Sequence, residues 1–141
     1  MPKVELKRLD RDMPLPSYAH EGDAGFDLVA REEVTIAPGE RVQVPTGIAL
    51  HIPDGYVGLV WDKSGLSHKH GLKTLGGVVD AGYRGEVMVG LVNLGTEPYT
   101  LERHHKVAQM LIQKVEQATL EIVDSLDDST RGTGGFGSTG T

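Results

Sequence analysis

The stretch VQVPTGIALHIPDGYVGLVW, residues 42–61, decides the fold class of this chain. Apolar residues alternate with other residues over 42–44 and again over 48–52, as in a strand that buries one face. The turn Pro53-Asp54-Gly55 follows, and residues 56–61 form a denser apolar run. Two extended runs joined by a tight turn predict antiparallel strands rather than helices.

Short strands of the same kind are predicted along the rest of the chain, at residues 4–9, 26–30, 34–36, 78–79, 86–94, 107–115 and 120–123. Residues 64–70 suit one short helix. The 19 glycines and 7 prolines fit many turns and oppose long helices. About ten short strands at turn spacing predict an all-β sandwich, barrel or jelly roll.

The strand faces are poor in large side chains, since the chain has 1 Trp, 4 Tyr and 2 Phe. Association of copies through a shared sheet surface would complete their burial, and a closed ring is the economical form.

Composition narrows the class of protein. The formal net charge of −6 argues against binding along a nucleic-acid backbone, which needs a basic stripe. The absence of Cys excludes disulfides, thiolate metal sites and Cys nucleophiles. The sequence has no run of about 18 apolar residues and begins without an apolar targeting segment, so we expect a cytoplasmic protein that binds neither nucleic acid nor membrane.

The apolar pattern stops at Asp124. We therefore expect a single β domain over residues 1–123 and a flexible Gly-rich tail over residues 124–141. A disordered terminus is one interpretation of this tail. Arg131, Phe136 and the glycines around them favour another, a mobile lid that closes on a phosphate and a base.

The segment Asp62-Lys63-Ser64-Gly65 lies between a predicted strand and the predicted helix. Backbone N–H groups and the Ser64 hydroxyl at such a turn can bind a phosphate. The alternative is a helix N-cap made by Ser64 or Asp62.

A second candidate site is Gly76 to Glu86, where two valines lead to Asp80 at the end of a strand and Tyr83 follows. A carboxylate there could accept a proton from water, and the ring could pack on a sugar. The alternative is a hairpin in which Asp80 caps its own backbone.

Histidines at 68, 70, 104 and 105 raise the possibility of a metal site, although solvated histidines are the simpler interpretation. Asp27 is a lone carboxylate at a strand start, suited to pair with a cation or to contact a metal through water.

Five segments in order resemble the five motifs of the trimeric dUTP pyrophosphatase (dUTPase) family: Ala24–Leu28, Lys63–Leu66, Gly77–Glu86, Lys106–Met110 and Arg131–Gly140. The resemblance implies a jelly-roll-like distorted β-barrel, the dUTPase-like β-clip, and a homotrimer with active sites shared between subunits. It implies hydrolysis of dUTP to dUMP and pyrophosphate by water attack at the α-phosphate, with Mg²⁺ as cofactor.

The resemblance also implies roles for single residues. Asp80 would activate the water, Tyr83 would pack under the deoxyribose, and the hairpin backbone would bind uracil through Gly77, Val78, Val79 and Met88. The phosphates would contact Lys63, Ser64, Gly65 and Gln109. The tail would supply Phe136 over the uracil and Arg131, Gly137 and Ser138 at the phosphates. Asp27 would contact Mg²⁺ only through water, because the ion is held mainly by substrate phosphates.

The sequence departs from the family pattern at Lys63 and Lys106, where the motifs usually carry Arg. Lysine keeps the charge but loses the two-pronged geometry. Two alternative functions stay open: a dCTP deaminase, or bifunctional dCTP deaminase/dUTPase, that would use Glu86 on the same fold, and a non-catalytic trimer that binds nucleotide.

Overall fold

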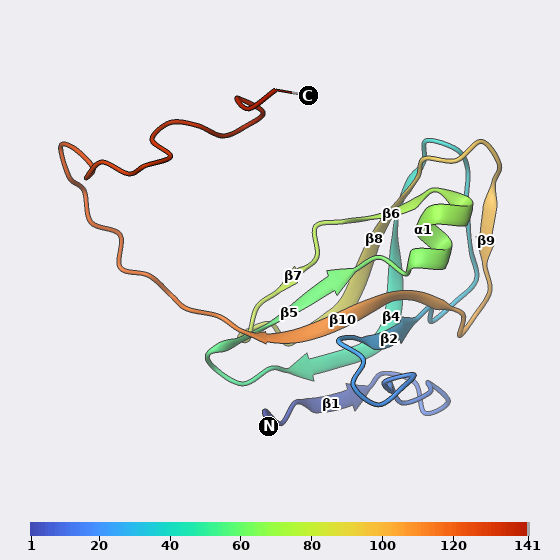
Figure 1. Ribbon diagram of the computed structural model, residues 1–141. Coiled ribbons are helices and arrows are strands. Elements are labelled where there is room, and N and C mark those ends of the chain that lie inside the picture. The colour runs from blue at the N-terminus through green and yellow to red at the C-terminus, as the bar shows by residue number, and fades with distance from the viewer. Residues whose placement is uncertain (141) are drawn as a thin grey trace.

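A computed structural model describes residues 1–140 (Figure 1). They form ten strands and one helix: β1 (Glu5–Arg8), β2 (Phe26–Val29), β3 (Val34–Ile36), β4 (Arg41–His51), β5 (Tyr56–Trp61), α1 (Ser64–His70), β6 (Leu72–Leu75), β7 (Val78–Val79), β8 (Glu86–Asn93), β9 (Tyr99–Leu101) and β10 (Lys106–Lys114). That helix is too short to cross a membrane, and no other helix lies within residues 1–140.

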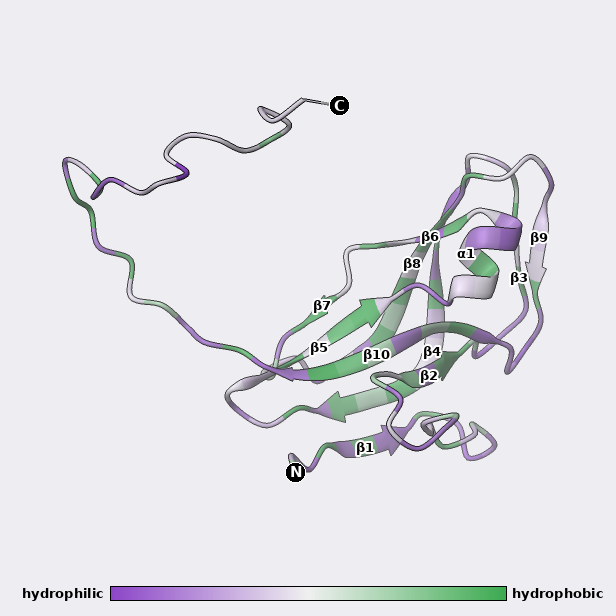
Figure 2. Ribbon diagram, viewed as in Figure 1, coloured by the Kyte–Doolittle hydropathy of each residue, from purple (hydrophilic) through white to green (hydrophobic). Residues whose placement is uncertain are grey.

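The strands form three antiparallel sheets with the orders β1-β4-β8-β6, β2-β10-β5-β7 and β3-β9. One buried cluster joins side chains from both four-stranded sheets. Val87, Val89 and Leu91 of β8 are each 1% exposed, as the period of two predicts. Hydrophobic residues gather on β5 and β10 in Figure 2. The predicted all-β, jelly-roll-like fold is confirmed. Its three sheets stay separate and do not close into one ring.

The quoted stretch forms one long strand, β4, and then β5. The register of β4 against β8 shifts between Pro45 and Ala49, where Gly47 has a φ of +73°. A Cβ on Gly47 would lie 2.8 Å from the buried side chain of Met13, so glycine satisfies both the backbone conformation and the packing.

The sequence did not predict β6 and β9, and the strand that it predicted at residues 120–123 is wrong. Residues 120–123 form no strand, and Leu120 and Ile122 are 92% and 98% exposed. Alternation alone cannot make a strand without an edge to pair with. Beyond β10 the chain runs away from the body of the molecule (Figure 1). Thr141, the last residue of the predicted tail, lies outside the described residues.

Candidate active site

The first candidate cluster lies where β5 ends and α1 begins. Lys63 occupies the N-cap position and α1 has no side-chain cap, so the predicted alternative of a cap by Ser64 or Asp62 is wrong. The carboxylate of Asp62 instead accepts the Thr74 N–H at 2.7 Å and the Lys73 ammonium at 2.8 Å. Ser64 and Gly65 are exposed, and the Ser64 hydroxyl has no hydrogen bond within residues 1–140.

Asp27 of β2 anchors this cluster. It is 8% exposed, and its two carboxylate oxygens lie 2.6 Å from Lys63 Nζ and 3.1 Å from Lys106 Nζ. Burial alone would raise the pKa of Asp27, but the hydrogen bonds from Lys63 and Lys106 outweigh it and hold the pKa below its ordinary value. Both lysines that replace the usual arginines therefore bind one carboxylate.

Gln109 of β10 joins the same cluster. It lies opposite Asp27 on one side and Trp61 on the other, and its side-chain amide donates to the carbonyl of Asp62 at 2.9 Å. Gly25 leaves room for it, because a Cβ there would lie 2.8 Å from Gln109 Oε1. The structure thus brings together predicted residues from the first, second and fourth motifs.

The second candidate cluster is the hairpin that follows β7. Gly77 has a φ of +111°, and its carbonyl accepts the Val60 N–H at 2.8 Å. The Asp80 carbonyl accepts the Tyr83 N–H at 3.1 Å, which closes the turn. The Asp80 side chain is exposed and makes no hydrogen bond within the described chain, so the predicted self-capping is wrong.

Tyr83 lies against the backbone of this hairpin. Its hydroxyl donates to the carbonyl of Glu86 at 2.8 Å, and its ring approaches Gly85 so closely that a Cβ there would lie 2.5 Å from the hydroxyl oxygen. Tyr83 is 46% exposed. Its hydroxyl is therefore held by the backbone while nearly half of the residue remains accessible.

Met88 lies on β8 at an open edge. β6 pairs with β8 from Leu72 opposite Asn93 to Leu75 opposite Gly90, and ends there. Among the described strands, none pairs with this side of β8 at Met88. Its backbone groups are therefore accessible beside the hairpin.

The two clusters lie at opposite ends of β5 (Figure 1). Val79, next to Asp80, lies opposite Gly58 of β5, whereas Ser64 lies three residues beyond Trp61, the end of β5. The three steps from Gly58 to Trp61 alone therefore separate the two clusters by about 10 Å, at ~3.3 Å per residue. One chain does not bring Asp80 to Ser64.

The tail residues lie in neither cluster. Arg131 donates to the carbonyl of Gly134 at 2.5 Å, the Gly135 N–H donates to Ser138 Oγ at 2.6 Å, and Phe136 is fully exposed. These contacts form local turns, and Figure 1 shows the tail far from both ends of β5.

The chain matches known proteins over nearly its whole length. A family model described as dUTPase matches residues 11–140. The chain belongs to the dUTPase family. The deoxyuridine 5'-triphosphate nucleotidohydrolase of Thermobifida fusca is 55% identical over 143 residues, which cover 98% of this chain and 79% of that dUTPase.

Solved dUTPases share the fold. The dUTPase of Staphylococcus bacteriophage 80alpha, in a structure with dUPNHPP, is 29% identical with a TM-score of 0.92 over 99% of both chains. The dUTPase of phage phi11 of S. aureus, in a mutant form solved for the coordination of a structural Mg(II) ion, is 26% identical. It has a TM-score of 0.82 over 87% of this chain and 97% of that chain.

Two sets of contacts around the dUTPase motifs were not expected from the sequence. Asp62 links the turn before α1 to β6, and Glu86 binds Arg31 and the Gly47 N–H. The partners of Arg31 lie 21 and 55 residues away along the chain, so no local pattern could reveal them.

Proposed function

We propose that this member of the dUTPase family hydrolyses dUTP to dUMP and pyrophosphate in the cytoplasm, by water attack at the α-phosphate. The reaction keeps uracil out of DNA and supplies dUMP for thymidylate synthesis. The family match over residues 11–140 and the 55% identity to a deoxyuridine 5'-triphosphate nucleotidohydrolase support this activity. The observation that carries the mechanism is the exposed Asp80 carboxylate, free of hydrogen bonds within residues 1–140, at a hairpin that also presents Tyr83.

The hairpin cluster is the proposed nucleoside side of the site. Asp80 orients and deprotonates the attacking water, and Tyr83 packs under the deoxyribose where a 2'-hydroxyl would clash. Gly77 and Met88 offer backbone groups to the uracil edge, with Val78 and Val79 beside them. The amino group of cytosine would face a backbone N–H donor there and would find no hydrogen-bond acceptor, which gives selectivity for uracil.

The cluster at the start of α1 is the proposed phosphate side. Ser64, Gly65 and Gln109 would contact phosphate oxygens. A hollow of about 260 Å³ beside them is lined by Lys63, Lys69, His70 and Lys106, among others, so positive charge faces it. Hydrolysis at phosphorus needs little more from the protein than positioned groups and neutralised charge.

Magnesium fits this site only as an ion that arrives with the substrate. Within residues 1–140 no group of three His, Asp or Glu side chains could hold a metal. Asp27 already binds two ammonium groups, but its remaining lone pairs can reach a hydrated ion through water. When bound on the phosphates, Mg²⁺ would neutralise their charge.

The separation of the clusters supports a homotrimer with shared sites. A general base acts within hydrogen-bond reach of its target, or through one water. We infer that Asp80 of one chain meets Ser64 of another, since β5 holds them apart within one chain. The tail, with Arg131, Phe136, Gly137 and Ser138, extends away from its own body and would close over a site on a neighbouring copy.

No observation favours the two alternative functions. A deaminase would need Glu86 for proton transfer, but its carboxylate binds Arg31 at 3.3 Å and the Gly47 N–H at 2.8 Å. A purely binding trimer would give no turnover, whereas the relatives matched over nearly the whole chain are named as nucleotidohydrolases.

A nucleotide panel tests the proposal. We expect the purified protein with Mg²⁺ to release pyrophosphate from dUTP and to leave dCTP, dTTP and UTP largely intact. Asp80→Asn should lower kcat by about 10²- to 10⁴-fold, the usual contribution of a general base. Asp54→Asn, in the exposed turn before β5, is the matched control and should keep the wild-type rate. Ammonia from dCTP would indicate the deaminase, and the absence of any turnover would contradict the proposal.

A further inference from the structure

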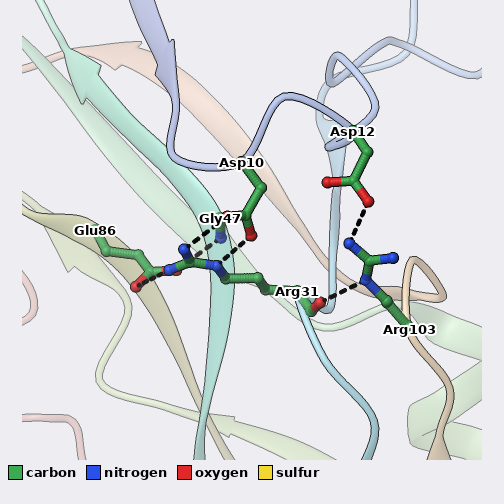
Figure 3. A network of polar contacts seen from close by, with 6 residues as sticks. All are labelled: Asp10, Asp12, Arg31, Gly47, Glu86 and Arg103. Atoms are coloured by element: carbon green, nitrogen blue, oxygen red, sulfur yellow. Dashed lines mark hydrogen bonds and ion pairs between the residues drawn. The ribbon is translucent and has the colours of Figure 1, made fainter.

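A polar network around Arg31, just after β2, joins five segments of the chain (Figure 3), and its six side chains or backbone groups make no proposed substrate contact. Two of the segments, those of Asp10 and Glu86, contact the guanidinium itself. Its Nε and Nη2 donate to the two carboxylate oxygens of Asp10 at 2.6 and 3.1 Å. Its Nη1 lies 3.3 Å from each carboxylate oxygen of Glu86. Arg103 extends the network by donating from Nε to the Arg31 carbonyl at 3.2 Å and pairing with Asp12. A planar guanidinium holds two carboxylates in fixed directions, which an ammonium cannot do.

Glu86, the first residue of β8, is held from two sides. Besides Arg31, its Oε2 accepts the N–H of Gly47 at 2.8 Å, at the point where β4 shifts register against β8. The Arg31 N–H in turn donates to the Pro45 carbonyl at 2.8 Å on the same strand. The Glu86 side chain is 21% exposed, so water screens these contacts only in part.

The backbone of Glu86 leads from this network to the proposed substrate site. Its carbonyl accepts the hydroxyl hydrogen of Tyr83 at 2.8 Å. The hairpin between Asp80 and Glu86 is otherwise exposed, apart from partly buried Ala81. A ring on an exposed hairpin is held more firmly when the residue that binds its hydroxyl is fixed, and the contacts of the Glu86 side chain with Arg31 and Gly47 fix that residue.

We propose that Arg31 is a positioning residue for the Tyr83 ring and thereby sets the selectivity for deoxyribose over ribose. This inference rests on the proposed function. With Arg31 in place, the ring stays under the sugar and leaves no room for a 2'-hydroxyl. Without the Arg31–Glu86 contact, the start of β8 and the hairpin can shift together, the ring can retreat, and UTP can enter.

The test compares kcat/KM for dUTP with kcat/KM for UTP in four variants. Arg31→Lys and Glu86→Gln weaken the contact from either end, and Tyr83→Phe removes the hydroxyl. Asp12→Asn is the matched control, because it removes the ion pair with Arg103 at the edge of the network and leaves both carboxylates on the Arg31 guanidinium in place. We expect the dUTP/UTP ratio to fall about tenfold in the first three variants and to stay within about twofold of wild type in Asp12→Asn.

A double variant separates positioning from general stability. If Arg31 acts through the Tyr83 hydroxyl, Arg31→Lys in the Tyr83→Phe background should lower the ratio no further, although it still lowers the Tm. If Arg31→Lys does not fold, the same comparison is made with Glu86→Gln, whose combination with Tyr83→Phe should likewise lower the dUTP/UTP ratio no further than Tyr83→Phe alone. An unchanged ratio in the single variants, or a full further drop in the double variant, would overturn the inference. Lack of dUTP turnover by the wild-type protein would instead overturn the proposed function.

Discussion

Asp27 shows how single residues in this protein serve both fold and site. Among the described residues it is the one buried charged side chain, and its two partners carry the cationic charge of the second and fourth motifs. The carboxylate therefore fixes the lysines beside the proposed phosphate positions. Because one oxygen goes to each ammonium, the single-pronged geometry of lysine is sufficient here.

The stability that Asp27 contributes depends on pH. Its pKa is lower in the folded protein than in the unfolded chain, so the contribution is complete above about pH 3.9 and is lost as the pH falls through the folded value. We expect Asp27→Asn to lower the free energy of unfolding by about 1–3 kcal/mol at pH 7, as for hydrogen bonds to charged groups. Urea unfolding at pH 7 and at successively lower pH, until the difference between the wild type and the variant stops changing, measures this dependence.

The matched control for this prediction is Asp12→Asn. Asp12 also forms an ion pair, in its case with Arg103, but both partners are at least half exposed, so the loss should be smaller. An equal loss in both variants, or a loss in Asp27→Asn that persists at low pH, would contradict the assigned role.

At the scale of elements, alternation and turns predicted most strands of the body, because each of those strands buries one face against the core. β6 and β9 were missed: they are four and three residues long, and their place depends on pairing with β8 and β3. The strand predicted at 120–123 was wrong for the converse reason, since its apolar residues find no pairing edge in their own chain.

The candidate site was predictable to a similar depth. The motifs located Asp80, Tyr83, Ser64 and Gln109, and the structure groups them into two clusters. The sequence could not show that the Asp62 carboxylate accepts the Thr74 N–H instead of capping α1, because that contact depends on how β6 lies beside the end of β5.

Gly77 tests the conformation of the hairpin. A Cβ there would lie 2.8 Å from the Val60 carbonyl oxygen, at a φ of +111° that other residues rarely adopt. We expect Gly77→Ala to lower kcat/KM for dUTP about tenfold or more, since strain of about 1–3 kcal/mol has to be relieved by moving the hairpin. Steady-state kinetics with Gly82→Ala as control checks this, because a Cβ at Gly82 meets nothing within 4 Å. Equal effects of the two substitutions would contradict the account.

The tail is the second element open to test. Residues 124–139 are exposed apart from Gly134 and Gly135 and extend away from the body, so a chain that ends at Ser129 should unfold at the wild-type temperature and keep its oligomeric mass. Because the tail is the proposed lid, kcat/KM for dUTP should fall by about 10²-fold or more. Light scattering, thermal unfolding and kinetics on the truncated chain give the three readings. Full activity after truncation would remove the tail from the site.

At the scale of the whole molecule, the separation between the two clusters within one chain is the feature that any assembly of this protein has to explain. Strand β5 links the proposed phosphate side to the proposed nucleoside side and also keeps them apart. The exposed Leu120, Ile122 and Leu126 lie on the segment that leaves the body, at 92%, 98% and 86% exposure. Such apolar side chains are suited to lie on another copy, which would carry the tail toward a neighbouring site.

The most direct test of the shared site is subunit complementation. Asp80→Asn chains and Ser64→Ala/Gln109→Ala chains, each expected to be nearly inactive, are refolded together in equal amounts and assayed with dUTP. If each site takes Asp80 from one chain and the phosphate side from another, random mixing restores about one quarter of the wild-type sites. If the mixed assemblies remain as inactive as either parent, each site is built within one chain and the central claim is wrong.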